Sequence, residues 1–255
     1  METRTTTFTG PSGYTYTIRE QNGEDENILS NQNDIKNIMH LTKFISAIVV
    51  DTDATTSHKL TIDGALNLPA LDRYAILVHS RIFSLGNDMV FTYKWPDVSE
   101  PTEYTDTISD YIFTDYSQEP TEEELEAKPN AIPYYPDRDF CKEGKVITLS
   151  SGKQVSFKAL TGVGEQYVIN LPVEKQTRNS ELIARDLCLS VNGNFEKVTN
   201  FSLFNPRDMA EIRKAVSTFD PVFVGLTQID HPTDPNQKTQ IPIFALQSFF
   251  FLTEV

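Results

Sequence analysis

The chain has 255 residues, with 36 aspartates and glutamates against 22 lysines and arginines, and a formal net charge of −14. With 39% hydrophobic and 11% aromatic residues, it is too apolar for a wholly disordered protein, and its length allows one large domain or two of about 100 to 150 residues. The acidic excess disfavours binding to nucleic acid or to an anionic membrane surface, so we expect neither as a partner.

No apolar run approaches the roughly 18 to 20 residues that a membrane helix needs, and Met1–Thr5 does not resemble the start of a signal peptide. Cys141 and Cys188 are too few for a disulfide scaffold and do not form a C-x-x-C half-site. We therefore expect synthesis in a reducing, intracellular compartment. Cys188 lies in an apolar pattern of helical spacing and is predicted to be a small core residue.

The first part of the chain predicts the order hairpin, helices, hairpin. Alternating residues around the turn Pro11-Ser12-Gly13 indicate the first hairpin, and apolar residues at helical spacing indicate two helices. The predicted elements are strands 6–9 and 14–19, helices 35–49 and 70–83, and closing strands 89–95 and 107–113.

The middle of the chain holds most of the charge. Residues 97–143 contain 14 acidic residues, three basic residues and five prolines, a net charge of −11, which is typical of a solvated, irregular connector. Within it, Thr121 as N-cap and Glu124 three residues later predict a short helix. The pair Tyr134-Tyr135 between prolines is predicted to anchor the connector on a domain.

The last part of the chain repeats the order of the first. A helix with Asn205 as N-cap, Pro206 at its first position and Asp208 at its third is the clearest start in the sequence. The predicted elements are strands 146–149 and 154–158, helices 180–189 and 205–219, and closing strands 222–228 and 239–251.

The two outer parts also align with each other. Residues 11–26 match residues 150–165 without gaps at an offset of 139, and four pairs are identical. These are Ser12/Ser151, Gly13/Gly152, Gly23/Gly162 and Glu26/Glu165. We therefore predict an α+β protein of two related halves packed as a pseudo-dimer: a first repeat at 1–117, an acidic connector at 118–144 and a second repeat at 145–255.

A search for chemistry gives no catalytic, cofactor-binding or metal site. The four histidines, His40, His58, His79 and His231, show no metal-ligand spacing, and the chain has no P-loop and no G-x-S-x-G motif. We expect a protein that is not an enzyme and needs no cofactor. His40 and His79 are predicted to be ordinary helix-surface or core-edge residues.

Aromatic residues give the candidate partner contacts. Trp95-Pro96 and His231-Pro232 are predicted at the tips of the two closing hairpins, and protruding tips are frequent contact sites. The run Phe249-Phe250-Phe251 is predicted to be a closing strand buried on both faces, or alternatively an edge strand completed by another subunit. The candidate contacts are Trp95, Pro96, His231, Pro232, Phe249, Phe250 and Phe251.

These patterns together resemble the baseplate hub assembly proteins of T-even-like tailed bacteriophages. The resemblance lies in residues 13–26 and 152–165, in the segments 71–74, 81–86 and 205–209, and in the terminal phenylalanines. Similar sequences often carry C-x-x-C pairs at the hairpin tips, suggestive of a zinc knuckle. Here those places read Trp95-Pro96-Asp97 and Asp230-His231-Pro232, so no zinc site is carried over.

The resemblance implies a non-enzymatic structural or assembly protein of a phage tail or baseplate. Such a protein would bind hub, tail-tube or tape-measure proteins in an oligomeric assembly, in the host cytoplasm during assembly or in the virion tail. Two alternatives stay open: an acidic module whose connector mimics phosphates and inhibits a host nucleic-acid-binding protein, and an uncharacterised hydrolase with a site built from scattered residues.

Overall fold

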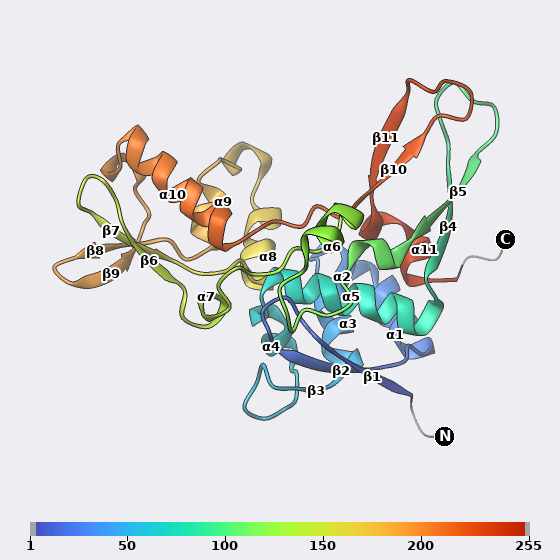
Figure 1. Ribbon diagram of the computed structural model, residues 1–255, viewed down its shortest axis with the longest axis horizontal. Helices are drawn as coiled ribbons and strands as arrows, with labels where there is room; N and C mark the ends of the chain where they lie inside the picture. The colour runs from blue at the N-terminus through green and yellow to red at the C-terminus, as the bar shows by residue number, and fades with distance from the viewer. Residues whose placement is uncertain (1–3, 253–255) are drawn as a thin grey trace.

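The computed structural model describes residues 4–252 and has an α+β fold of helices and small antiparallel sheets (Figure 1). Two lobes and an arm are visible (Figure 1). The first lobe holds the sheet β1-β2-β3 with helices α1 to α5, the second lobe holds the sheet β6-β7-β8-β9 with α8 to α10, and the arm consists of the hairpins β4-β5 and β10-β11.

The elements follow one another in this order. The chain up to the connector contains β1 (Thr5–Thr9), β2 (Thr15–Arg19), α1 (Gly23–Ser30), α2 (Gln32–Lys36), α3 (His40–Ile48), β3 (Val49–Thr52), α4 (Ile62–Asn67), α5 (Ala70–Leu85), β4 (Asp88–Tyr93), β5 (Thr102–Thr107) and the 3₁₀ helix η1 (Ile108–Tyr111). The connector contains α6 (Glu122–Ala127) and α7 (Asp139–Glu143). The remainder contains β6 (Lys145–Thr148), β7 (Gln154–Phe157), α8 (Gly162–Asn170), η2 (Val173–Lys175), α9 (Ser180–Ala184), β8 (Cys188–Val191), β9 (Asn194–Lys197), η3 (Phe201–Leu203), α10 (Pro206–Phe219), β10 (Leu226–Asp230), β11 (Lys238–Pro242), η4 (Ile243–Ala245) and α11 (Gln247–Phe250).

Both predicted opening hairpins are confirmed. β1 pairs with β2 from Thr5↔Arg19 to Thr9↔Thr15, and β6 pairs with β7 in the same antiparallel manner. Gly13 at the first turn has φ +89°, a conformation that costs glycine little because it has no Cβ. Each hairpin gains a further antiparallel strand, β3 on β2 and β8 on β7.

The predicted helix starts are also confirmed. Thr121 and Glu124 form a capping box on α6, and Asn205 and Asp208 form one on α10, in each case satisfying backbone N–H groups that the first turn leaves free. The α+β class is therefore as expected. The order of elements around the two sheets is similar, while duplication of one unit stays a prediction.

Two of the predicted helices are wrong. The helix expected over 35–49 is divided by Ile38, whose φ of +57° ends one helix before α3 begins, and Val49 then starts β3. Cys188 lies in β8 and not in a helix, because α9 ends at Ala184 and Asp186 adopts φ +52°. Positive φ in residues with a side chain leaves no trace in hydrophobic periodicity.

The predicted closing strands also differ from the observed ones. The strand predicted at 107–113 lies at 102–107 and is followed by η1. Phe249 and Phe250 belong to the short helix α11, and no strand includes them among residues 4–252. An unbroken apolar run cannot distinguish a buried strand from a buried helical turn.

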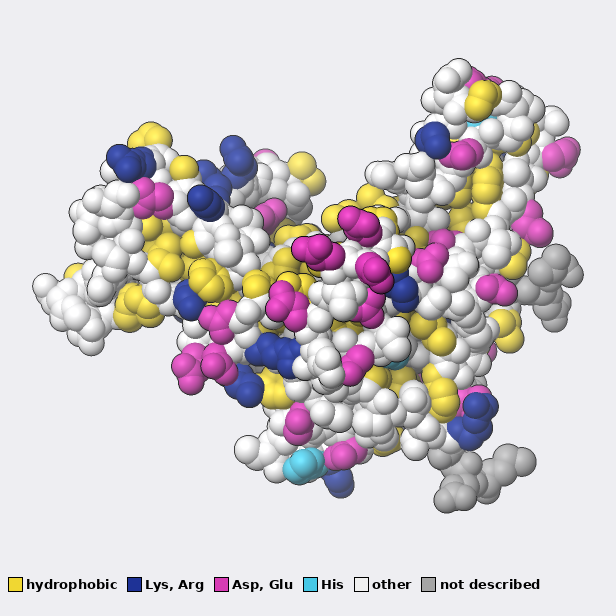
Figure 2. Space-filling model, in the orientation of Figure 1, with side chains coloured by type: hydrophobic (Ala, Val, Ile, Leu, Met, Phe, Trp, Pro, Cys, Tyr) yellow, Lys and Arg dark blue, Asp and Glu magenta, His cyan; other side chains and the backbone are white. Residues whose placement is uncertain are grey.

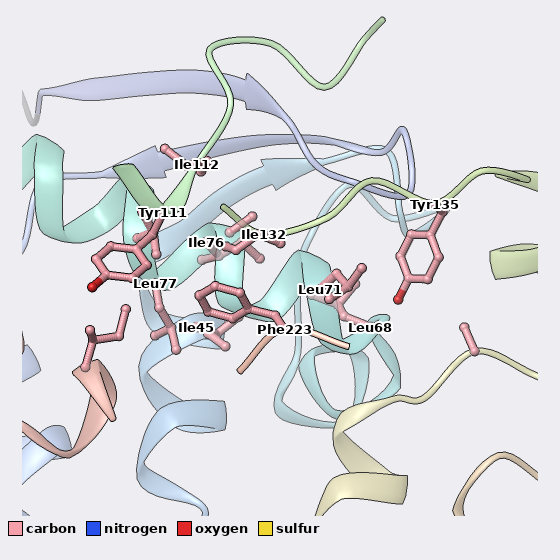
Figure 3. Close-up of a cluster of buried hydrophobic side chains, with 14 of the residues drawn as sticks. Ile45, Leu68, Leu71, Ile76, Leu77, Tyr111, Ile112, Ile132, Tyr135 and Phe223 are labelled. Carbon is pink, nitrogen blue, oxygen red and sulfur yellow. The ribbon is translucent and has the colours of Figure 1, made fainter. Parts of the chain in front are cut away.

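Helix α5 lies at the centre of the core (Figure 3), and its first turn contacts four other parts of the chain. Figure 3 shows Leu71 beside Leu68 and Tyr135, so the connector packs on this turn. Further along α5, Ile76 and Leu77 lie among side chains from α3, η1 and the connector. A mostly buried helix of this kind orders the elements packed around it.

Asp72 holds the turn of the first hairpin. Its carboxylate accepts hydrogen bonds from the Ser12 backbone N–H at 2.9 Å, from the Ser12 hydroxyl, and from the Tyr16 hydroxyl at 2.7 Å. Gly10 allows this approach, since a Cβ there would lie 2.8 Å from the Tyr16 ring and 3.0 Å from Asp72. Burial raises the pKa of Asp72 to about 6, although the hydrogen bonds from Ser12 and Tyr16 oppose that shift.

Arg73 and Tyr74 connect α5 to α8 of the second lobe. Arg73 Nε lies 3.2 Å from Glu165 Oε2, and the Tyr74 hydroxyl donates to the other oxygen of Glu165. Arg73 also donates to the Ala65 carbonyl at 2.7 Å. Gly162 at the start of α8 leaves room for the guanidinium of Arg73, because a Cβ at this position would lie 2.7 Å from Arg73 Cζ. Both partners of this ion pair are largely buried, so each depends on the other to offset its desolvation.

The connector is irregular, as expected, but it is anchored along its length. Its residues Ile132, Tyr135 and Phe140 are buried. The Ile132 carbonyl accepts a hydrogen bond at 2.6 Å from the hydroxyl of Tyr116, a buried residue just before the connector. The predicted anchor is therefore confirmed at Tyr135. Within residues 4–252, no helix combines the length and the apolar character required to cross a membrane.

We predict that the Asp72→Asn variant loses part of the pH dependence of folding. Because the pKa of Asp72 is raised on folding from 3.8 to about 6, its contribution to stability is complete below about pH 4 and is lost as the pH rises through 6. The unfolding free energy of the wild type relative to Asp72→Asn should therefore fall by on the order of 3 kcal/mol between pH 4 and pH 7. Urea denaturation at several pH values measures this difference. A difference independent of pH would contradict the assignment.

We also predict that Glu165→Ala destabilises the protein by about 3 to 5 kcal/mol, because it leaves the buried Arg73 guanidinium unpaired. The matched control is Glu26→Ala at the aligned position, since Glu26 is exposed and its loss should cost less than about 0.5 kcal/mol. Denaturant titration of both variants gives the comparison. Equal costs would show that Glu165 has no special role.

Candidate functional site: the arm and the hollow at its base

Two hairpins distant in sequence lie side by side and project from the body as the arm (Figure 1). β4 pairs with β5 from Asp88↔Thr107 to Tyr93↔Thr102, and β10 pairs with β11 from Leu226↔Pro242 to Asp230↔Lys238. The two sheets are not joined by backbone pairing among the described strands. Side chains must therefore hold the hairpins together.

A clasp of side chains joins the two hairpins at the end of the arm. The rings of Trp95 and His231 meet edge to face, with centroids 4.6 Å apart. Trp95 Nε1 donates to the Tyr104 hydroxyl at 2.8 Å, and that hydroxyl donates to the Asp230 carbonyl at 2.8 Å. Aromatic contacts of this geometry stabilise beyond simple burial, so the clasp fixes the two tips relative to each other.

The hydrogen bonds of His231 define its tautomer. Nδ1 faces the backbone N–H groups of Thr233 at 3.3 Å and Asp234 at 3.0 Å and must accept from them. The proton of the neutral ring is therefore assigned to Nε2, which donates to Asp97 at 3.1 Å. This hydrogen bond is the main cause of the lowered pKa of the Asp97 carboxyl. His231 thus links the two hairpins as a neutral donor.

The structure brings four of the seven predicted contact residues together and separates the other three. Trp95 and His231 are buried against each other, whereas Pro96 and Pro232 beside them are exposed. The free surface of the tip is therefore formed around the prolines and not by the aromatic rings.

The terminal phenylalanines lie elsewhere. Phe249 and Phe250 are buried, and Phe250 packs edge to face against Phe44 of α3 at 6.3 Å. Phe249 packs against Phe244 at 4.9 Å, and Phe251 is half-buried. These side chains attach the C-terminal segment to the first lobe.

Sequence reasoning missed a second feature, a cavity of about 340 Å³ at the base of the arm, here called the hollow. Its lining includes Pro129, Ala131, Val222, Val224, Leu226 and Gln228. Val222 and Val224 are 67% and 68% exposed, in the irregular segment between α10 and β10. The sequence holds an apolar run at this place, but we predicted that residues 222–228 form a closing strand.

Helix α6 flanks the hollow. It ends at Ala127, two residues before Pro129, and carries four glutamates. Figure 2 shows acidic side chains beside apolar ones between the second lobe and the arm. Lys128 does not offset this charge, since its ammonium group donates to the carbonyls of Ser109 and Ile112, each at 2.8 Å. Within residues 4–252, the α6 glutamates take part in no ion pair.

A larger cavity of about 490 Å³ lies beside α8 and α9. Its charged lining is already paired: Lys158 and Lys197 lie near Asp186, and Arg185 lies 2.6 Å from Asp220. The described residues hold no group of three or more His, Cys, Asp or Glu side chains placed to bind a metal. The hollow therefore differs from this cavity in having exposed apolar side chains next to charge that the protein does not compensate.

Comparison of the chain with protein-family models, with curated proteins and with solved structures finds no match. The arm and the hollow are consequently interpreted from their own geometry.

We predict that His231→Ala loosens the tip of the arm. Trp95 is the single tryptophan of the chain and is 2% exposed, so its emission should move to longer wavelength when the facing imidazole is removed. Hydrogen exchange should accelerate in β4, β5, β10 and β11, because local opening becomes easier. The control His58→Ala removes an exposed ring and should leave the emission unchanged. An unchanged spectrum in His231→Ala would show that the clasp does not hold the tips.

Proposed function

We propose that the protein is a non-enzymatic structural or assembly protein of a phage tail or baseplate, which binds hub, tail-tube or tape-measure proteins. The observation that carries the proposal is the pairing of a projecting, clasped arm with a hollow at its base in which Val222 and Val224 are exposed. Exposed apolar side chains grouped in one place are typical of surfaces that bind another protein. The proposal also rests on the sequence resemblance, which includes the first turn of α5.

The reactive side chains of the described chain support a binding role. Ser12 and Asp72 form a close pair of a hydroxyl and a carboxylate, but they are 2% and 0% exposed, so a substrate would have no access to them. Burial raises the pKa of Cys141, with the nearby acidic residues adding to the effect, and a protonated thiol is a poor nucleophile. Burial likewise lowers the pKa of His79 to about 4, as fits a core-edge histidine stacked on Phe8.

The place of action follows from the same proposal. An assembly protein of this kind would act in the host cytoplasm while the tail is built, or would stay in the virion tail, in an oligomeric complex with its partners. The arm tip, with Pro96 and Pro232 exposed, would be one contact.

Co-expression tests this proposal. The tagged protein, produced together with the hub, tail-tube and tape-measure proteins of one phage, should co-purify with at least one of them and should crosslink to it through the arm or the hollow. The variant Pro96→Asp/Pro232→Asp should weaken this co-purification without changing Trp95 emission, because both prolines are exposed beside the clasp. A protein that elutes alone from all three co-expressions would contradict the proposed function.

A further inference from the structure

We propose that the hollow binds a basic amphipathic segment of a partner protein, which places apolar side chains against Val222 and Val224 and lysines or arginines against α6. This inference deepens the proposed function and rests on it, since it names the chemistry of the partner. Three observations carry it: the exposed apolar lining, the shape of the hollow, and the charge beside it.

The apolar lining gives the first reason. Val222 and Val224 are more than two-thirds exposed, while Phe223 between them is buried and packs on Tyr74 of α5 with ring centroids 5.5 Å apart. The segment is thus held at its middle residue and presents both valines outward. Covering two such side chains with apolar groups removes apolar surface from water, which favours the complex.

The shape gives the second reason. A volume of about 340 Å³ lies at the lower end of the range for pockets that bind a ligand, roughly 300 to 1,000 Å³. Gln228 and Gln240 of the arm line one side of the hollow, and Pro129 and Ala131 of the connector line another. A groove of this kind suits a helix that inserts a few apolar side chains.

The negative charge of α6 gives the third reason, because it favours a basic partner. Glu122, Glu123 and Glu126 are exposed and form no ion pair within residues 4–252. Glu124, in contrast, accepts hydrogen bonds from Thr121 at the helix cap. An acidic or neutral segment would leave this charge uncompensated, but lysines and arginines on the partner would neutralise it.

Basic residues line a cavity that adjoins the hollow at Val222. Arg178 and Arg213 line a separate cavity of about 320 Å³ that shares Val222 with the hollow, and Figure 2 shows basic side chains on the second lobe. A basic face placed over that cavity would meet these two arginines. The bound segment should accordingly direct its basic face toward α6.

A synthetic peptide tests the inference without a phage partner. The probe is a fluorescent peptide of about 18 residues, long enough to form a helix, with leucines on one face and lysines on the other; a scrambled peptide of the same composition is its control. Fluorescence anisotropy should show that the amphipathic peptide binds at least about tenfold more tightly, a difference of about 1.4 kcal/mol. Equal binding of both peptides would show that net charge alone causes the binding and would overturn the inference.

Variants locate the site. Val222→Asp/Val224→Asp should weaken binding about tenfold or more, whereas Val173→Asp, at a valine that is 82% exposed outside the hollow, should change it by less than about twofold. All three valines are exposed, so the substitutions should not impair folding. Equal effects at the two places would overturn the inference.

The role of the α6 glutamates is tested with one variant and a matched control. The triple change Glu122→Gln/Glu123→Gln/Glu126→Gln should weaken peptide binding and its salt dependence more than a control that removes the same charge at Glu103, Glu174 and Glu196, which are exposed. A peptide carrying a photoreactive leucine analogue should crosslink to residues 129–131 and 222–226 of the wild type. Crosslinks confined to other segments would overturn the inference even if a variant failed to fold.

The two proposals fail in different ways. If a tail protein co-purifies equally with the wild type and with Val222→Asp/Val224→Asp, the assembly function stands and the hollow is not its binding site. If the amphipathic peptide binds the hollow but no tail protein co-purifies, the site stands and the proposed phage function fails.

Discussion

The first turn of α5 is the constraint on which the rest of the structure depends. Four consecutive residues, Leu71 to Tyr74, contact the connector, the turn of the first hairpin, α8 of the second lobe and the C-terminal segment. Two of them are charged and almost fully buried, so each needs its partners in place to offset the cost of desolvation. This turn therefore joins the folding of the first lobe to the docking of the second.

The candidate binding surfaces follow from this arrangement. After α10 the chain leaves the second lobe, passes Val222 and Val224, and returns to the first lobe, where Phe244 stacks on Tyr74 with ring centroids 5.5 Å apart. The hollow lies where the chain crosses, and the second hairpin of the arm begins just beyond it. Because both ends of the crossing segment are packed, the hollow and the arm keep a defined shape that a partner can recognise without reordering the protein.

Local signals explain what could be predicted from the sequence. The capping boxes at Thr121 and Asn205 and the glycine turn at Gly13 each depend on residues close together in the chain, and all three were found. The break at Ile38 and the helix at Phe249 depend on tertiary packing that outweighs local periodicity. The tips at Trp95 and His231 were identified as notable, but their mutual burial depends on two hairpins meeting across 136 positions of sequence. The hollow was missed for the same reason, since exposure of Val222 cannot be inferred from hydrophobicity.

The central claim is that the two lobes, joined through Arg73, Tyr74 and Glu165, form one cooperative body that fixes the shape of the hollow. Differential scanning calorimetry of the full chain tests this claim most directly. A single transition is expected, in which the calorimetric and van't Hoff enthalpies agree, as for a two-state domain. Two separate transitions, or a van't Hoff enthalpy well below the calorimetric one, would show that the lobes unfold independently and would contradict it.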